Sequence, residues 1–306
     1  MIKLKSFAKI NLGLEVVNKR EDGYHNLRTI FQTINLFDEI IIKEIKSANL
    51  VLNGSNSSIK WDETNTIYNI YCEVNKRFKI NRGFDVFVNK NIPIQSGLGG
   101  GSSNAAVFLL FLNNYFKLNL SLKEMIDIAR RVGADIPFFL VGGRAIAYGI
   151  GEELINLNYE PLKIGLVLSR INVPTSLVFS SNILTTTEIK SKINIFLRTG
   201  DYSVLKNNLE ETTFRYFPEL KKIKDKMLNI GFKTVLMTGS GSAFFTTGKL
   251  SELKKLYENF DNVLIVDSID RNSYFKEIGA WPSGKASVFG ADIRRFESSR
   301  PSNDIK

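Results

Sequence analysis

One short segment combines the glycine, serine and asparagine residues that bind phosphate in proteins. It runs from Pro93 to Asn104 and holds four glycines, at positions 97, 99, 100 and 101. Without side chains, the backbone N–H groups of such a turn can close around an anion. Ser102, Ser103 and Asn104 then supply hydroxyls and N-cap chemistry where an apolar helix should begin, and a helix N-terminus attracts negative charge. We therefore predict that this segment holds the phosphates of a nucleotide.

Two common phosphate-binding motifs do not account for this segment. The chain contains no Gly-Lys-Ser or Gly-Lys-Thr, which a P-loop requires. Ser102 stands where the dinucleotide-binding fingerprint has its third glycine. A mobile linker is the plain alternative, since linkers are also rich in glycine and serine. The position of the segment between a strand-like and a helix-like stretch favours the phosphate site.

Three other groups of residues could do chemistry beside a nucleotide. Lys9 and Asn11 interrupt an apolar strand, and Asp135 lies between a predicted helix and Pro137. Residues 238–242, Thr-Gly-Ser-Gly-Ser, form a second small-residue turn between two predicted strands. Each group is weak alone, because a strand lysine is commonly solvated and an aspartate before Ile-Pro commonly forms a turn. Periodicity does not bring the three groups together.

Composition excludes several classes of protein. The chain has 306 residues, 43% of them hydrophobic, which is enough apolar material for two domains. Its single cysteine, Cys72, excludes an internal disulfide and suits a reducing compartment. Its single histidine, His25, excludes a zinc site built from several His and Cys ligands. Any metal would be a hard cation held by oxygens, most simply Mg²⁺ that arrives with a nucleotide.

Charge and hydropathy indicate which partners to exclude. The net charge is +10, but the lysines are spread among Asn and Ile without an aromatic–basic cluster, so we expect no nucleic-acid partner. The longest apolar run, Ala105–Leu112, is too short to cross a bilayer, and the first residues lack a signal peptide. We expect a cytoplasmic protein that does not bind membranes and is a monomer or weak homodimer.

Hydrophobic periodicity predicts the elements that position these residues. The first twenty residues alternate in a way that indicates paired strands. A capping box, Ser121-Leu-Lys-Glu124, opens a helix that ends at Gly133 and buries Leu122, Met125, Ile126 and Ala129. The pattern predicts an α+β fold in two domains, 1–155 and 156–278. Further strands are expected at 31–43, 85–90, 164–168, 234–237, 243–247 and 263–266, and further helices at 102–116, 219–228 and 251–258.

The last residues, 279–306, lose apolar periodicity. Residues 281–284 and 295–298 back-translate naturally to sequences that resemble the D-arm and T-arm of transfer-RNA genes. We therefore predict a disordered tail without selected function, whose reading frame continues into a transfer-RNA gene. An ordinary disordered tail is the alternative. The coding DNA decides between the two.

Taken together, the motifs resemble the GHMP kinase superfamily over about residues 1–278. The resemblance is carried by Ala8-Lys-Ile-Asn-Leu12, by segment 93–104 and by Gly133-Ala-Asp-Ile-Pro137. Arg20-Glu-Asp-Gly-Tyr-His-Asn-Leu27 resembles the branch that acts on a cytidine diphosphate substrate. The resemblance implies an α+β fold of two domains with the active site in the interdomain cleft. It also implies ATP-dependent phosphorylation of the 2-hydroxyl of a cytidine diphosphate methylerythritol, in the non-mevalonate (methylerythritol phosphate) route to isoprenoid precursors.

The resemblance further implies roles for individual residues. Asp135 is expected to be the general base with Lys9 beside it, and Asn65 and Lys90 are expected near the adenosine. The remaining ATP contacts are expected from Pro93, Gly97, Leu98, Gly99, Gly100, Gly101, Ser102 and Ser103. Substrate contacts are expected from Asn11, Tyr24, His25, Thr175, Phe179, Gly239 and Gly241.

Plainer interpretations of the same residues stay open. Tyr24 and His25 could merely close a hairpin after Asp22-Gly23, and Phe179 could be a core residue. Another kinase of the superfamily, acting on mevalonate or homoserine, would need no site for a base. A non-catalytic nucleotide sensor would need neither Lys9 nor Asp135.

Overall fold

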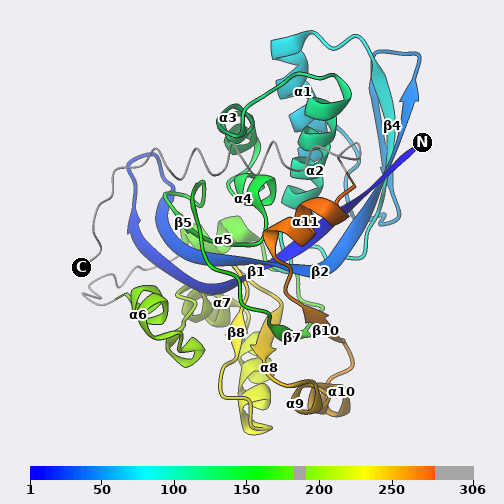
Figure 1. Cartoon of the computed structure of the whole chain (residues 1–306). Coiled ribbons are helices and arrows are strands. Elements are labelled where there is room, and N and C mark those ends of the chain that lie inside the picture. The colour runs from blue at the N-terminus through cyan, green and yellow to red at the C-terminus, as the bar shows by residue number, and fades with distance from the viewer. Residues whose placement is uncertain (182–190, 280–306) are drawn as a thin grey trace.

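Figure 1 shows the computed structural model, which describes residues 1–181 and 191–279 and contains two sheets. The first sheet has six strands: five run in the order β3-β4-β2-β5-β6, and β1 pairs with β2 outside this path. The second has four strands in the order β10-β7-β9-β8. The strands are β1 (Ile2–Lys19), β2 (His25–Ile45), β3 (Leu50–Gly54), β4 (Gly83–Asn89), β5 (Arg144–Tyr148), β6 (Glu153–Asn156), β7 (Lys163–Val167), β8 (Leu236–Met237), β9 (Phe244–Thr247) and β10 (Val263–Asp267).

The helices fall into two groups on either side of the long strands β1 and β2. In Figure 1, α1–α4 lie above these strands, and α8–α10 lie below them beside the second sheet. The helices are α1 (Thr66–Phe78), α2 (Gly100–Tyr115), α3 (Leu122–Val132), α4 (Ile136–Val141), α5 (Thr175–Ser180), α6 (Lys192–Thr199), α7 (Leu209–Tyr216), α8 (Pro218–Asn229), α9 (Leu250–Leu253), α10 (Lys255–Asn259) and α11 (Arg271–Glu277), with a 3₁₀ turn η1 (Tyr202–Val204).

Strand β1 is one long element, so the prediction of paired strands within the first twenty residues is wrong. It pairs antiparallel with β2 along its length, and the register shifts after Phe7, Asn11 and Val16. Each shift interrupts the alternation of inward and outward side chains. In the sequence alone, such an interruption looks like a turn between two strands. The shift after Asn11 also decides which side chains of β1 and β2 meet in the functional site.

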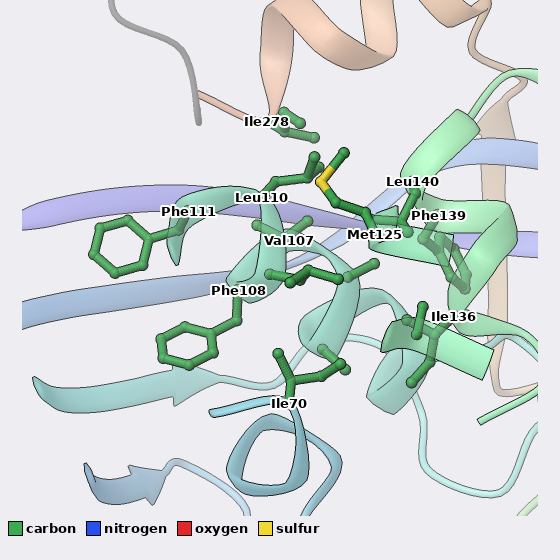
Figure 2. Close-up of a cluster of buried hydrophobic side chains, with 14 of the residues drawn as sticks. Ile70, Val107, Phe108, Leu110, Phe111, Met125, Ile136, Phe139, Leu140 and Ile278 are labelled. Atoms are coloured by element: carbon green, nitrogen blue, oxygen red, sulfur yellow. The ribbon is translucent and has the colours of Figure 1, made fainter. Parts of the chain in front are cut away.

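A layer of helices on the first sheet forms a large hydrophobic core. Residues Ala105–Leu112 of α2 are all buried, as expected for a helix that is apolar on every side. Figure 2 shows Phe108 and Phe111 of this helix in the cluster, together with Met125 of α3 and Phe139 of α4. Because α2 is enclosed by neighbouring elements, its N-terminus is held rigidly at the functional site.

The capping box predicted at the start of α3 is confirmed. The Ser121 hydroxyl accepts the backbone N–H of Glu124, and the Glu124 carboxylate accepts the backbone N–H of Ser121. The helix ends at Gly133, also as predicted. The buried face of the helix differs from the predicted one at one position, because Ile128 is buried and Ile126 is only partly buried.

The two halves of the chain share hydrophobic contacts. Ile10 and Ile30 of the first sheet lie in the same buried cluster as Ile164 of β7. Helix α11 returns to the core of the first half, where the buried Tyr274 donates a hydrogen bond to the carbonyl oxygen of Phe139 at 2.5 Å. The predicted domain boundary between 155 and 156 falls within β6 and stays a prediction. Residues 251–258, predicted as one helix, form the two short helices α9 and α10.

The C-terminal tail and the absence of membrane-spanning helices were also predicted from the sequence. The predicted tail lies, beyond Gly279, outside the described residues. Within residues 1–181 and 191–279, no helix is both long enough and apolar enough to cross a membrane.

Candidate active site

The glycine segment turns the chain into the N-terminus of α2. Gly99 is the N-cap with a φ of 73°, and Gly97 has a φ of 77°. Both angles lie in the left-handed region that glycine adopts without strain. No side chain caps the helix, and Ser102 and Ser103 lie inside its first turn, so their predicted N-cap role is wrong. The first N–H groups of α2 have no partner within the helix and are available to an anion.

The second small-residue turn packs directly on the glycine segment. A Cβ on Gly97 would lie 2.0 Å from the carbonyl oxygen of Thr238, so only glycine fits there. The Thr238 hydroxyl lies 3.2 Å from the carbonyl oxygen of Gly97, to which it can donate. The N–H of Ala243 donates to the carbonyl oxygen of Ser96 at 3.1 Å. The C-terminal half of the chain thereby supports the phosphate-binding segment of the N-terminal half.

Lys9 and Asp135 form an ion pair beside the glycine segment. The backbone N–H of Lys9 donates to the carbonyl oxygen of Leu98 at 3.0 Å, which ties β1 to the segment. Lys9 Nζ lies 3.2 Å from Asp135 Oδ2 and donates to Asn11 Oδ1 at 2.7 Å. The side chain of Lys9 is 3% exposed, whereas that of Asp135 is 36% exposed. The carboxylate therefore faces the cleft, and the ammonium lies buried behind it.

A short helix positions the carboxylate of Asp135. Asp135 is the residue that precedes α4, and Pro137 stands in the first turn of that helix, where a missing N–H costs nothing. All residues of α4 are buried. Because the helix is enclosed, the residue at its start is fixed next to Lys9 although the two are far apart in the sequence.

One end of the cleft carries aromatic side chains. The ring of His25, the first residue of β2, lies 5.8 Å from the ring of Phe179 in α5, measured between centroids. Burial, with a smaller effect of the Lys19 charge, lowers the pKa of His25 below its ordinary value of 6.5. Its imidazole is therefore neutral at pH 7. Tyr24 is exposed beside it.

Helix α5 also reaches the second small-residue turn. The hydroxyl oxygens of Thr175 and Ser240 lie 2.9 Å apart, and both residues line the cleft together with Gly239. Gly241 points elsewhere, since a Cβ there would lie 2.6 Å from the sulfur of Met237. The predicted substrate contact of Gly241 is thus not in the cleft wall, and it stays a prediction.

The two residues predicted near the adenosine, Asn65 and Lys90, also line the cleft. Asn65 caps α1, and its Oδ1 accepts the N–H of Ile67 at 3.0 Å. The ammonium of Lys90 pairs with the fully buried carboxylate of Asp38 and donates to Asn104 Oδ1 at 3.2 Å. Both side chains therefore have hydrogen-bond or ion-pair partners within the fold, in addition to their position in the cleft. The sequence contains no sign of these structural contacts.

These elements enclose a cleft of about 970 Å³ between the two halves of the chain. Three predicted site residues do not line it: Leu98, Ser103 and Gly241. Leu98 and Ser103 belong to the glycine segment, but their side chains are fully buried. The predicted residues that do line it are Lys9, Asn11, Tyr24, His25, Asn65, Lys90, Pro93, Gly97, Gly99, Gly100, Gly101, Ser102, Asp135, Thr175, Phe179 and Gly239.

Sequence reasoning missed several residues of the cleft wall. Thr29 is fully buried and hydrogen-bonded to Asn11, but a threonine within a strand gives no signal of this. Trp61 lines the cleft close to Asn65 in the chain, and its indole N–H donates to the carbonyl oxygen of Asn56 at 3.0 Å. A large aromatic residue in a polar loop before a helix was the available signal for Trp61. Phe31 and Thr66 were also missed, whereas Gln95 and Ser240 lie within the two segments, 93–104 and 238–242, that the sequence singled out.

The cleft also offers oxygen ligands for a hard cation. Across the described parts of the chain, no three His, Cys, Asp or Glu side chains gather closely enough to hold a metal ion. The hydroxyl of Ser102 and the carboxylate of Asp135 both line the cleft. Such oxygens, completed by phosphate and water, are the usual ligands of Mg²⁺. The donors therefore fit an ion that arrives with a nucleotide.

Comparison with known protein families agrees with this geometry. The profile of the GHMP kinases N terminal domain matches residues 65–143, and that of the GHMP kinases C terminal matches residues 188–265. A 4-diphosphocytidyl-2-C-methyl-D-erythritol kinase of Caldicellulosiruptor bescii is 39% identical over 254 residues, which covers 80% of this chain and 88% of that protein. A kinase of the same name from Alkaliphilus oremlandii is 39% identical over 268 residues, covering 84% and 92%.

Solved structures extend the comparison. A crystal structure of a 4-(cytidine 5'-diphospho)-2C-methyl-D-erythritol kinase superposes with a TM-score of 0.74 at 31% identity, covering 87% of this chain and 99% of that one. A mevalonate kinase superposes with a TM-score of 0.62 at 16% identity, covering 88% and 100%, and shares the fold. With the ion pair, the glycine segment and the interdomain cleft, these relatives show that the chain belongs to the 4-diphosphocytidyl-2-C-methyl-D-erythritol kinases of the GHMP kinase superfamily.

Proposed function

We propose that this chain transfers the γ-phosphoryl group of ATP to the 2-hydroxyl of 4-diphosphocytidyl-2-C-methyl-D-erythritol, a step toward isoprenoid precursors in the methylerythritol phosphate pathway. The observation that carries the proposal is the Lys9–Asp135 pair, with 3.2 Å between Nζ and Oδ2. The pair lines one continuous cleft with the glycine segment and with the aromatic end at His25 and Phe179. A phosphate donor and a base-bearing acceptor would therefore meet at a carboxylate.

Asp135 acts as the general base in this proposal. As the acceptor oxygen attacks the γ-phosphorus, the hydroxyl proton passes to the Asp135 carboxylate, the new O–P bond forms, and the bond between the γ-phosphorus and the bridging oxygen breaks to release ADP. The Lys9 ammonium lies beside the Asp135 carboxylate and would offset the negative charge that develops on the acceptor oxygen. Phosphoryl transfer depends mostly on such positioning and charge stabilisation, so one carboxylate and one cation suffice.

The N-terminus of α2 is the proposed site of the ATP phosphates. Its first N–H groups are unpaired within the helix, and the positive φ angles of Gly97 and Gly99 bring backbone rather than side chains to the cleft. Mg²⁺ bound with ATP would be held by the Ser102 hydroxyl together with phosphate oxygens, and it would neutralise charge on the transferred phosphoryl group.

The aromatic end is the proposed site of the cytosine base. Phe179 and the exposed Tyr24 can stack on a base, and the neutral His25 can donate or accept a hydrogen bond. Mevalonate and homoserine carry no base, so an aromatic end of the cleft would serve neither. Hydrogen bonds from Thr175, Asn11 and the backbone at Gly239 complete the proposed acceptor site.

The enzyme is expected to work in the cytoplasm without an obligatory partner.

The direct test is an assay of the purified full-length chain with ATP, Mg²⁺ and 4-diphosphocytidyl-2-C-methyl-D-erythritol. ADP release and the mass of the product are followed together, with mevalonate and homoserine as matched alternative acceptors. We expect phosphate on the cytidine substrate alone and competitive inhibition by cytidine nucleotides. Equal turnover of mevalonate, or no effect of cytidine nucleotides, would overturn the assignment of the acceptor.

A further inference from the structure

We propose that Thr29 is a positioning residue that fixes the orientation of the Asn11 amide and, through it, of the Lys9 ammonium. The inference deepens the proposed kinase function and rests on it. Thr29 lies in β2 and is fully buried, and Asn11 and Lys9 in β1 are 2% and 3% exposed. The three side chains form a hydrogen-bonded series that ends at Asp135.

The direction of each hydrogen bond follows from the chemistry of its groups. The Thr29 hydroxyl has one hydrogen, which it donates to the carbonyl oxygen of Gly13 at 2.7 Å. Its oxygen is then free only to accept, and it accepts from Asn11 Nδ2 at 2.8 Å. With its amino group held by Thr29, Asn11 must turn its carbonyl oxygen toward Lys9. A lysine ammonium can only donate, so this is the orientation that Lys9 requires.

The irregular pairing of β1 and β2 makes this arrangement possible. Asn11 is paired with Phe31, the register then shifts, and Leu14 is paired with Thr29. Gly13 follows directly after this shift, and its carbonyl oxygen accepts the hydrogen of the Thr29 hydroxyl at 2.7 Å. The bulge in β1 therefore serves the orientation of Asn11.

Loss of the Thr29 hydroxyl would leave Asn11 Nδ2 without its acceptor, so that only Lys9 and the Thr238 hydroxyl, 3.3 Å from Asn11 Oδ1, would still favour the present direction of the amide. A rotated amide would point its N–H₂ group at the Lys9 ammonium, two donors facing one another in a buried site. Lys9 would then lose the acceptor 2.7 Å from its Nζ and shift relative to Asp135. Binding of ATP at α2 and of the base at Phe179 lies elsewhere in the cleft. The expected defect is thus in turnover rather than in the affinity for ATP.

The test compares Thr29→Val, which removes the hydroxyl at nearly constant shape, with Thr29→Ser, which retains it. We expect Thr29→Val to lower kcat by about 10- to 100-fold, as for a small displacement of a reacting group, with the KM for ATP within about twofold of the wild type. Thr29→Ser should recover most of the turnover. Thr29→Ala provides a second loss of the hydroxyl should Thr29→Val fold poorly.

Thr33 offers a matched control on the same strand. It is equally buried, and its hydroxyl has no hydrogen-bond partner among the described residues. Thr33→Val should therefore leave kcat unchanged, although it makes the same chemical change at a neighbouring inward position of β2. An equal loss of turnover in Thr33→Val would show that the defect reflects packing of the strand, and it would overturn the proposal.

A double-mutant cycle with Asn11→Ala tests whether Thr29 acts through Asn11. If it does, adding Thr29→Val to Asn11→Ala causes no further loss of kcat, because the amide it orients is already gone. The same cycle on denaturant midpoints should also be non-additive, and this readout needs no substrate. Additive losses in both cycles would refute the coupling. Wild-type turnover in the same assay reports on the proposed function separately.

Discussion

The carboxylate of Asp135 stands in front of the ammonium of Lys9, with 3.2 Å between Oδ2 and Nζ and with 36% of the Asp135 side chain exposed against 3% for Lys9. A substrate in the cleft thus meets the carboxylate first, and the cation supports it from the protein side. The order suits a base that must take a proton from an acceptor while a fixed positive charge stabilises the oxygen that remains.

Replacement of the proposed base should strongly reduce turnover while leaving nucleotide binding intact. We expect Asp135→Asn to lower kcat by roughly 10²- to 10⁴-fold, because the amide keeps the shape of the side chain but cannot accept the proton. Steady-state kinetics measures kcat, and titration calorimetry measures ATP affinity, which should change little. Turnover near that of the wild type would remove Asp135 from this role.

The aromatic end of the cleft should set the affinity for the acceptor. Phe179→Ala should raise the KM for the cytidine substrate by roughly 5- to 150-fold, the equivalent of about 1–3 kcal/mol of stacking, with the KM for ATP unchanged. Tyr257→Ala is a suitable control, since Tyr257 is 55% exposed on α10 and does not line the cleft. If both variants behave alike, Phe179 is a core residue and not part of a base site.

The close contact of the two small-residue turns predicts a steric requirement for glycine at 97. In Gly97→Ala, the new Cβ would lie 2.0 Å from the carbonyl oxygen of Thr238, at a φ of 77° that disfavours alanine. We expect a lower melting temperature and a higher KM for ATP. Gly101→Ala is the matched control for stability, because its Cβ would meet only Thr66 Oγ1 at 3.8 Å. Equal melting temperatures for the two variants would contradict the described packing.

Titration of His25 should make the protein less stable in mild acid. Its pKa is lowered in the folded chain by burial and by Lys19, so below pH 6.5 the unfolded chain takes up this proton before the folded one does. The contribution of His25 to stability is therefore complete above pH 6.5 and is lost as the pH falls toward the folded pKa. Urea midpoints of the wild type and His25→Gln, measured between pH 8 and pH 5, isolate the effect because the chain has one histidine. A constant difference between the two curves would show that the pKa is not lowered.

Some features of this protein follow from local chemistry and could be read from the sequence. The glycines at 97–101 predict a turn in which side chains would not fit. The capping box of Ser121 and Glu124 could be predicted because it involves only residues at the start of its own helix. Local preference also explains the error at the start of α2. Serine is a common N-cap, so the sequence predicted a start at Ser102, but Gly99 is the N-cap with a φ of 73°. A local preference predicted the element and missed its boundary.

The site itself depends on contacts between residues that are distant in the chain. The sequence determined the residue types, and family resemblance paired Lys9 with Asp135, but periodicity carries no information about which strand faces which helix. The buried pair of Lys90 with Asp38 and the series from Thr29 to Lys9 arise from the pairing of β1, β2 and β4. Only the tertiary structure decided them, because a hydrogen bond or ion pair forms where packing excludes water and brings its two groups within about 3 Å.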